Sequence, residues 1–230
     1  ALRNTIIISA WKMALHLLVP VIVSILLNEI RSNAFRRISQ TLIYLPHFLS
    51  WIILAGIMID LLSPNGGLVN RFLGLFGAEP IFFLGSNKWF RFTLVFTDVW
   101  KEFGFGTIVY LAAITNIDPT QYEAATIDGA NRFQRIMHVT LPNMRMIIVL
   151  MMVLSLGNVL NAGFDQVYNM YSEAVYPTGD ILDTFIYRLN FKNGLWGQSA
   201  AVSMFKSVVS TLFISVSYLC AYKFADYRVF

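Results

Sequence analysis

The strongest constraint on this chain is a set of apolar segments, each long enough to cross a lipid bilayer. Five of them lie at about residues 5–28, 39–62, 92–115, 144–165 and 198–222. A helix needs about 20 residues to cross the roughly 30 Å hydrocarbon core of a membrane. Charged residues make up 13% of the chain, whereas soluble domains carry roughly 25%. The sequence therefore predicts an all-α membrane protein with about five transmembrane helices.

The remaining composition excludes several classes of function. A formal net charge of +4 on 230 residues is too small to indicate nucleic-acid binding. The single cysteine, Cys220, cannot form an internal disulfide, and it is expected to be a packing residue. The three histidines are far apart in sequence, so no metal site is expected. No phosphate-binding G-x-x-x-x-G-K-[ST] loop occurs, so we expect a chain that is not an enzyme and binds no cofactor of its own.

Residues 118–142, between the third and fourth apolar segments, carry helix signals of their own. Asp118 before Pro119 is typical of an N-cap and first helical turn, with Gln121 as the capping partner. This short helix is expected to run to about Asp128 and to end at Gly129, which can adopt a positive φ.

A second short helix is predicted directly after that glycine. Asn131 with Gln134 indicates its start, and Pro142 is expected to close it. Two short helices that meet at a glycine between membrane segments favour a docking element. From spacing alone, an ordinary surface connection is the alternative.

The residues of this loop resemble a known motif. Glu123-Ala124-Ala125, Asp128-Gly129-Ala130 and Leu141-Pro142 are similar to the EAA motif of permease subunits in binding-protein-dependent ABC importers. Further similarity follows in Tyr44-Leu45-Pro46-His47-Phe48, Ser50-Trp51, Trp100-Lys101 and Tyr110-Leu111-Ala112, so it covers essentially the whole chain. It is nearest the carbohydrate permeases for acidic polysaccharide fragments such as rhamnogalacturonan and alginate. Two departures are Val139, where isoleucine is usual, and the lack of a proline in 143–146.

This resemblance implies a type I ABC importer permease with a MetI-like core and short cytoplasmic coupling helices. Residues 1–230 would form one permease domain, with an N-terminal span of the full protein missing, and 118–142 would be the cytoplasmic coupling loop. The residues implied in ATPase coupling are Glu123, Ala124, Ala125, Asp128, Gly129, Ala130, Leu141 and Pro142. ATP-driven closure of the ATPase subunits would move this loop and open the path by alternating access.

The resemblance also implies partners and a location. A second, related permease, two ATPase subunits that hold ATP and Mg²⁺, and an extracytoplasmic solute-binding protein would assemble with this chain to import an oligosaccharide. The location would be the inner (plasma) membrane of a bacterial-type cell, and the cluster Arg31, Arg36 and Arg37 agrees with a cytoplasmic side for the motif loop. The alternatives are a secondary transporter or a structural membrane subunit. A secondary transporter is expected to show inverted repeats or broken helices, and the sequence indicates neither.

Several polar residues interrupt the apolar segments. We regard Lys12, His16, Asp98, Lys101, Glu102, Asn158, Asn161 and Lys206 as candidates for a substrate path. Placing a charge in lipid costs about 2.5–3.5 kcal/mol on insertion scales, so these groups are expected to face protein or water. Structural pairing, such as Asp98 with Lys101, is the alternative. The excess of cations among them favours an acidic cargo.

Overall fold

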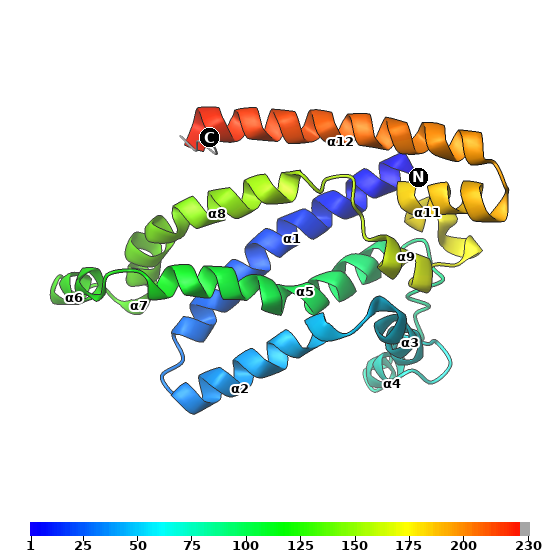
Figure 1. The fold of residues 1–230 in the computed structure, drawn as a ribbon. Helices are drawn as coiled ribbons and strands as arrows, with labels where there is room; N and C mark the ends of the chain where they lie inside the picture. The colour runs from blue at the N-terminus through cyan, green and yellow to red at the C-terminus, as the bar shows by residue number, and fades with distance from the viewer. Residues whose placement is uncertain (226–230) are drawn as a thin grey trace. The chain divides into compact units, whose positions relative to one another are not determined.

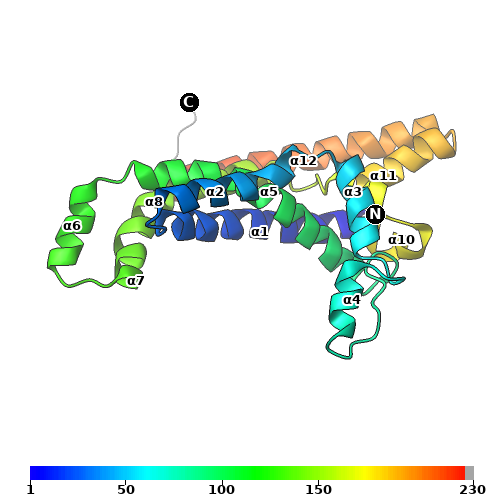
Figure 2. The ribbon, with the colours of Figure 1, turned by 90° about the horizontal axis from the view of Figure 1, so that it is seen from below.

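The computed structural model describes the backbone of residues 1–225 and their side chains, except those of residues 217 and 220–225. All regular elements in this part of the chain are helical, as the sequence predicts (Figures 1 and 2). Cys220, expected to be a packing residue, lies outside the described side chains.

Groups of short helices separate the long helices along the chain. The long helices are α1 (Leu2–Asn28), α5 (Phe90–Thr115), α8 (Leu141–Leu156) and α12 (Trp196–Ala225). The shorter elements are α2 (Asn33–Tyr44), η1 (Leu45–Phe48), α3 (Trp51–Leu61), α4 (Leu68–Gly74), α6 (Pro119–Ile127), α7 (Arg132–Arg135), η2 (Ile136–Thr140), α9 (Phe164–Met170), η3 (Glu173–Val175), α10 (Tyr176–Gly179), α11 (Leu182–Tyr187) and η4 (Arg188–Lys192).

By length and composition, three helical stretches of the described chain can cross a membrane, namely Leu2–Asn28, Arg132–Leu156 and Trp196–Val216. A fourth is counted if Asn33–Phe48 and Trp51–Leu61 form one bent span. The predicted third span is present as the 26-residue helix α5. It is not counted among these stretches because it is too highly charged. Every 18-residue stretch of α5 contains Asp98, Lys101 and Glu102, whereas a counted span has at most two charged residues in such a stretch.

The predicted second span, residues 39–62, is broken, and the expectation of a continuous helix is wrong. α2 ends at Tyr44, and a 3-10 turn precedes a new helix at Trp51. Pro46 lies in that turn and lacks the N–H that would continue the helical ladder. Ser50 caps the new helix, because its Oγ accepts a hydrogen bond from the Ile53 N–H at 3.4 Å. The chain therefore has a broken helix, a feature that is found in secondary transporters.

The predicted fourth span also ends earlier than expected. α8 stops at Leu156, and residues 157–163 form turns and non-helical backbone. Gly163, which precedes α9, has a φ of +87°, a conformation that favours glycine. Asn158 and Asn161 therefore lie in a connection and not in the last turn of a span.

The chain packs as two compact units, each built from separate stretches. The first comprises Ala1–Met13, Phe48–Val99 and Asn158–Phe213. Its buried side chains include Ile8, Leu54, Phe90, Leu94, Leu160, Val167, Val175 and Ile181. The prediction of one permease domain over residues 1–230 stays a prediction.

The second unit comprises Ala14–His47, Trp100–Gly157 and the chain from Ile214 onward. Its core is formed by Tyr110, Ile114 and Met144. Partly buried residues pack against this core, namely Leu17, Val21, Ile25, Ile147, Ile148 and Met151. Figures 1 and 2 show α6 and α7 together beyond the adjoining ends of α5 and α8.

Candidate functional site

The first helix of the loop starts as its sequence predicts. Oδ1 of Asp118 accepts a hydrogen bond from the Thr120 N–H at 2.9 Å and caps α6, with Pro119 in the first turn. This hydrogen bond favours the charged carboxylate and lowers the pKa of Asp118. Gln121 is not the capping partner, because its Oε1 accepts a hydrogen bond from Asn143 Nδ2 at 2.8 Å. The predicted cap is confirmed, whereas the role given to Gln121 is wrong.

The turn between the short helices is made by Gly129. Its φ is +78°, and the Ala130 N–H donates to the Ala125 carbonyl at 2.9 Å, so α6 ends in a left-handed cap. A Cβ at Gly129 would meet no atom within 4 Å. Backbone conformation, and not lack of space, is therefore what favours glycine here.

The second short helix starts as predicted but does not end at Pro142. Asn131 and Gln134 form a reciprocal capping box, with hydrogen bonds of 2.9 and 2.8 Å. α7 then continues through the π turn η2 into α8, where Pro142 stands in the first turn. The Leu141 N–H donates to the Ile136 carbonyl across this wider turn. The expectation that Pro142 closes the helix is wrong, because proline is tolerated at a helix start and the π turn precedes it.

Side-chain hydrogen bonds that sequence reasoning missed hold the loop together. The hydroxyls of Tyr122 on α6 and Thr140 on η2 are 3.0 Å apart, and Nη1 of Arg135 donates to the Thr126 hydroxyl at 3.2 Å. With the Gln121–Asn143 hydrogen bond, these contacts connect α6 to the helical run that leads into α8. No local sequence pattern signals such pairs, since each joins residues on different elements.

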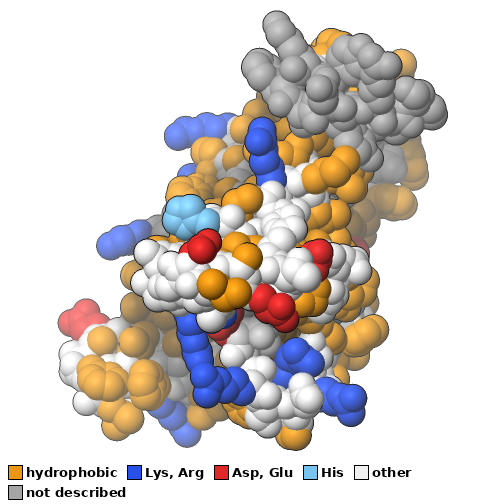
Figure 3. Space-filling view, turned by 90° about the vertical axis from the view of Figure 1, so that its left-hand side faces the viewer, with side chains coloured by type: hydrophobic (Ala, Val, Ile, Leu, Met, Phe, Trp, Pro, Cys, Tyr) orange, Lys and Arg blue, Asp and Glu red, His pale blue; other side chains and the backbone are white. Residues whose placement is uncertain are grey.

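The outward surface of the loop combines apolar and charged side chains. Ile127 is 87% exposed and Phe133 is 70% exposed. Glu123 and Asp128 are exposed beside them. Figure 3, which faces the side where α6 lies in Figure 1, shows hydrophobic surface among basic and acidic groups. Exposed aromatic and aliphatic side chains among charges are typical of a surface that binds another protein.

The other implied coupling residues lie on the same loop. Ala124, Gly129 and Pro142 are exposed, whereas Ala125, Ala130 and Leu141 are half-buried. The motif residues thus lie on α6, in the turn that follows it, and at the start of α8. Their role in ATPase coupling stays a prediction.

Lys12 forms a buried network with residues from α5 and α9. Its Nζ donates to the Ala162 carbonyl at 2.8 Å and to Gln166 Oε1 at 2.5 Å, and lies 3.0 Å from Asp98 Oδ1. Gln166 is fully buried, and its Nε2 donates to the Leu94 carbonyl at 2.7 Å. An ammonium group has three donors, and these acceptors match them. The geometry supports structural pairing for Lys12 and Asp98.

A second cluster surrounds Glu102 on α5. Its carboxylate lies 2.6 Å from Lys101 Nζ and 2.6 Å from His47 Nδ1, and Lys101 Nζ also donates to the His47 carbonyl at 3.0 Å. The Phe105 ring stacks on the His47 ring, with centroids 4.2 Å apart. These contacts fasten the 3-10 turn after α2 to α5. Sequence reasoning gave His47 no role beyond the motif similarity.

The remaining path candidates are dispersed. Lys206 on α12 forms an ion pair with Asp183 on α11. Asn158 and Asn161 are exposed, and His16 is half-buried on α1. Lys12, Lys101 and Lys206 therefore each have a carboxylate partner, so the excess of cations no longer supports an acidic cargo.

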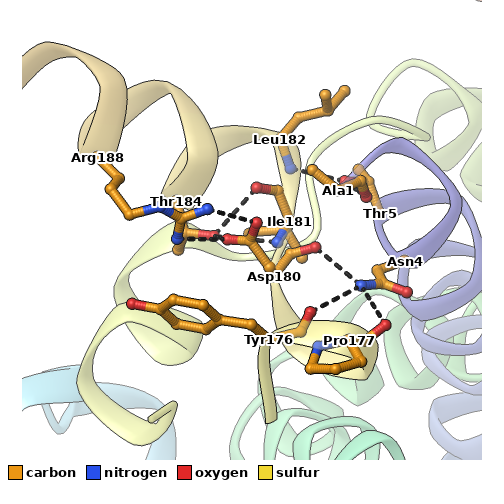
Figure 4. Close-up of polar contacts among 10 residues, drawn as sticks. All are labelled: Ala1, Asn4, Thr5, Tyr176, Pro177, Asp180, Ile181, Leu182, Thr184 and Arg188. Carbon is orange, nitrogen blue, oxygen red and sulfur yellow. Dashed lines mark hydrogen bonds and ion pairs between the residues drawn. The ribbon is translucent and has the colours of Figure 1, made fainter. Parts of the chain in front are cut away.

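A polar network that the sequence did not indicate joins the start of α1 to residues 176–188 (Figure 4). Arg188 donates to both carboxylate oxygens of Asp180, at 3.1 and 2.8 Å. Nδ2 of Asn4 donates to the Asp180 carbonyl at 3.1 Å, and the Leu182 N–H donates to the Thr5 hydroxyl at 2.8 Å. The hydrogen bonds that Arg188 donates to Asp180 favour the charged guanidinium and raise the pKa of Arg188. Among the described residues, no group of three or more His, Cys, Asp or Glu is placed to hold a metal ion.

Comparison with known proteins identifies the family. The model of the "binding-protein-dependent transport system inner membrane component" family matches residues 16–229. The chain belongs to this family. It is thus a membrane component of a transport system and not a member of an enzyme family.

Individual relatives agree with this assignment. The chain is 38% identical over 229 residues to the polygalacturonan/rhamnogalacturonan transport system permease protein YteP of Bacillus subtilis (strain 168), covering 100% of this chain and 71% of that protein. It is 39% identical over 229 residues to protein LplB of the same organism, covering 100% of this chain and 72% of that protein.

A solved structure confirms the fold. A chain in the crystal structure of a bacterial ABC transporter involved in the import of the acidic polysaccharide alginate matches with a TM-score of 0.93 at 35% identity. The match covers 97% of this chain and 78% of that chain. A second match, at a TM-score of 0.92, is to that alginate transporter in complex with an alginate pentasaccharide-bound periplasmic protein. The resemblance inferred from the sequence, to a MetI-like permease of the carbohydrate branch, is confirmed.

Proposed function

We propose that this chain is a transmembrane subunit of an ABC importer that moves oligosaccharides into the cell by ATP-driven alternating access. The observation that carries the proposal is the turn at Gly129, which joins α6 and α7 outside the long helices. A short helix with an exposed apolar tip and charged flanks fits a cleft of a partner protein. The motif residues Glu123 to Ala130 lie on this element.

The contacts of the loop suggest how movement reaches the membrane helices. Docked ATPase subunits, which bind ATP and Mg²⁺, push on α6 when they close. The hydrogen bonds Tyr122–Thr140 and Gln121–Asn143 connect α6 to η2 and α8. A displacement of α6 is therefore passed to α8 without melting the loop. This coupling requires α6 and α7 to lie in the cytoplasm of a bacterial-type cell.

The assembly follows from the same proposal. A second, related permease completes the transmembrane part, two ATPase subunits bind from the cytoplasm, and an extracytoplasmic solute-binding protein delivers the oligosaccharide. The alginate transporter whose permease matches this chain is described with a periplasmic protein, which supports the last of these partners.

We further propose that the oligosaccharide is acidic. The support comes from two relatives, one named for polygalacturonan and rhamnogalacturonan and one involved in the import of alginate. Both names denote sugars that carry carboxylates. The paired lysines of this chain add nothing to the argument, so the proposal depends on similarity alone.

The broken helix between α2 and α3 keeps a secondary transporter as the second candidate. Discontinuous helices form the substrate sites of many secondary transporters. Co-purification in detergent distinguishes the two, since an importer retains an ATPase subunit and a secondary transporter does not. The loop at 118–142 favours the importer.

The decisive experiment is ATP hydrolysis by the reconstituted complex in liposomes. We expect ATP turnover to rise with solute-binding protein loaded with oligogalacturonate or an alginate oligosaccharide, and to rise less with neutral oligosaccharides of equal length. Stimulation by neutral sugars alone would remove the acidic cargo and leave the importer. Absence of any bound ATPase subunit would remove the importer itself.

A further inference from the structure

The short helix α4 holds a row of large apolar side chains away from the protein. Leu68 and Phe72 lie on α4, and Leu75 and Phe76 lie in the turn that directly follows it, so the four residues have the spacing i, i+4, i+7, i+8. They are 62%, 60%, 81% and 76% exposed, respectively. The rings of Phe72 and Phe76 contact each other edge to face, with centroids 5.2 Å apart. We refer to these four residues as the α4 apolar face.

The opposite side of α4 is fixed by one buried side chain. Asn70 is 6% exposed, and its Nδ2 donates to the carbonyls of Ser63 at 3.0 Å and Ile81 at 2.9 Å. Its Oδ1 accepts a hydrogen bond from the Ile81 N–H at 2.8 Å. A Cβ at Gly67 would lie 2.6 Å from the Ser63 carbonyl oxygen, so the entry to the helix is also closely packed. The hydrogen bonds of Asn70 and the close packing at Gly67 therefore fix the orientation of the α4 apolar face.

The neighbours of α4 indicate its depth relative to the membrane–water boundary. Figures 1 and 2 both show α4 beside the end of α3. On α3, Ile52 is 73% exposed and Ile53 is 57% exposed, so this helix also presents an apolar outer face, as expected of a surface that contacts lipid or a partner subunit. The loop then leads to Trp89, whose ring contacts Phe83, with Lys88 Nζ 5.9 Å above it. Tryptophan with a nearby lysine is typical of the membrane–water boundary.

We propose that α4 is an interfacial helix whose apolar face rests among the acyl chains of the outer leaflet. Arg71, exposed on the flank of the helix, then meets the lipid phosphates. Lipid is favoured over a protein partner because the apolar face has no polar residue within it, and because the same loop leads to Trp89 and Lys88, a pair typical of the membrane–water boundary. The choice of leaflet rests on the proposed function, which places α6 in the cytoplasm. Lipid contact itself does not depend on that function.

Site-directed spin labelling tests this proposal. The label is attached at Leu75→Cys in a Cys220→Ser chain, within the assembled transporter whose other subunits lack reactive cysteines. Liposomes of phosphatidylethanolamine and phosphatidylglycerol provide the membrane. Glu79→Cys, an exposed position two residues beyond Gly77, is the matched control. We expect collisions with oxygen, which dissolves in lipid, to exceed those with a water-soluble nickel chelate several-fold at Leu75, and the reverse at Glu79.

Each outcome decides the proposal. If nickel reaches Leu75 as readily as Glu79, the apolar face lies in water and the proposal is wrong. If both reagents are excluded from Leu75, or added solute-binding protein immobilises the label, a protein covers the face and lipid does not. Asn70→Ala provides a second test, because release of α4 should lower the oxygen preference at Leu75. Collision rates need no transport activity, so failure of the importer proposal would be seen separately in the ATPase assay.

Discussion

The ammonium of Lys12 on α1 lies 3.0 Å from the carboxylate of Asp98 on α5, and both side chains are nearly buried. The same ammonium bonds to Gln166 and to the Ala162 carbonyl in the connection before α9. One cation thus joins two long helices and an interrupted stretch of backbone. Irregular backbone is tolerated inside a membrane protein where protein groups satisfy it.

The first prediction concerns this pair. Lys12→Met leaves Asp98 without its lysine, and removal of one partner of a buried ion pair costs about 3–5 kcal/mol. We expect a clear fall in the Tm of the detergent-solubilised complex. Lys12→Met with Asp98→Asn should recover part of the loss, because the double variant buries no carboxylate. An unchanged Tm in Lys12→Met with an altered substrate preference would instead place Lys12 in the transport path.

The second prediction concerns coupling. Gly129 has a φ of +78°, so Gly129→Leu forces a side chain into the left-handed region at a cost of about 1–2 kcal/mol. We expect substrate-stimulated ATP turnover to fall at least tenfold while the subunit still inserts in the membrane. Gly129→Asn is the control, since asparagine tolerates this conformation and should retain most activity. Wild-type ATP turnover in both variants would show that the turn is not needed for coupling.

The features that the sequence predicted well depend on neighbours within a few residues. Asp118 caps α6, Gly129 ends it, and Asn131 with Gln134 forms a capping box. Each involves the backbone of residues close in the chain, so residue type and spacing suffice. The all-helical membrane fold follows from apolar segment length in the same way.

The features that the sequence missed depend on distant contacts. Pro46 lies within the predicted span 39–62, and the helix breaks there, whereas Pro142 was expected to end a helix that continues. Backbone rules for proline are the same at both positions. The turn at Pro46 is stabilised by His47, which contacts Glu102 on α5. Spacing along the chain carries no information about such partners.

The third prediction concerns Gly104 on α5. A Cβ there would collide with the carbonyl of Ile43 on α2, whereas a Cβ at Gly106 would lie 3.1 Å from Cγ of Pro20, a contact that a shift of a few tenths of an ångström relieves. Backbone cannot yield as a side chain can. We expect Gly104→Ala to lower the yield and the Tm of the complex strongly, and Gly106→Ala to have a small effect. Similar Tm values for the two variants would show that α2 and α5 do not need this close approach.

The fourth prediction concerns topology. Asn131 opens α7, and Ser172 lies between α9 and η3, and both are exposed. In a Cys220→Ser background, a single cysteine at Asn131 should react with a membrane-impermeant maleimide only from the cytoplasmic side. A single cysteine at Ser172 should react only from outside. Reaction of both from one side would contradict the predicted five-span arrangement.

The last prediction separates a structural from a substrate role for Lys206. Its Nζ contacts the carboxylate of Asp183, and both side chains are partly buried, 23% and 21% exposed. Lys206→Met leaves a negative charge that repels an acidic oligosaccharide, so uptake of oligogalacturonate should fall more than uptake of a neutral sugar. Lys206→Met with Asp183→Asn removes that charge as well. If the pair is structural, the double variant should regain the wild-type ratio of acidic to neutral uptake. The measurement is the initial uptake of each labelled sugar into liposomes that contain the complex. If uptake of the acidic sugar stays selectively low in the double variant, Lys206 itself contacts the cargo.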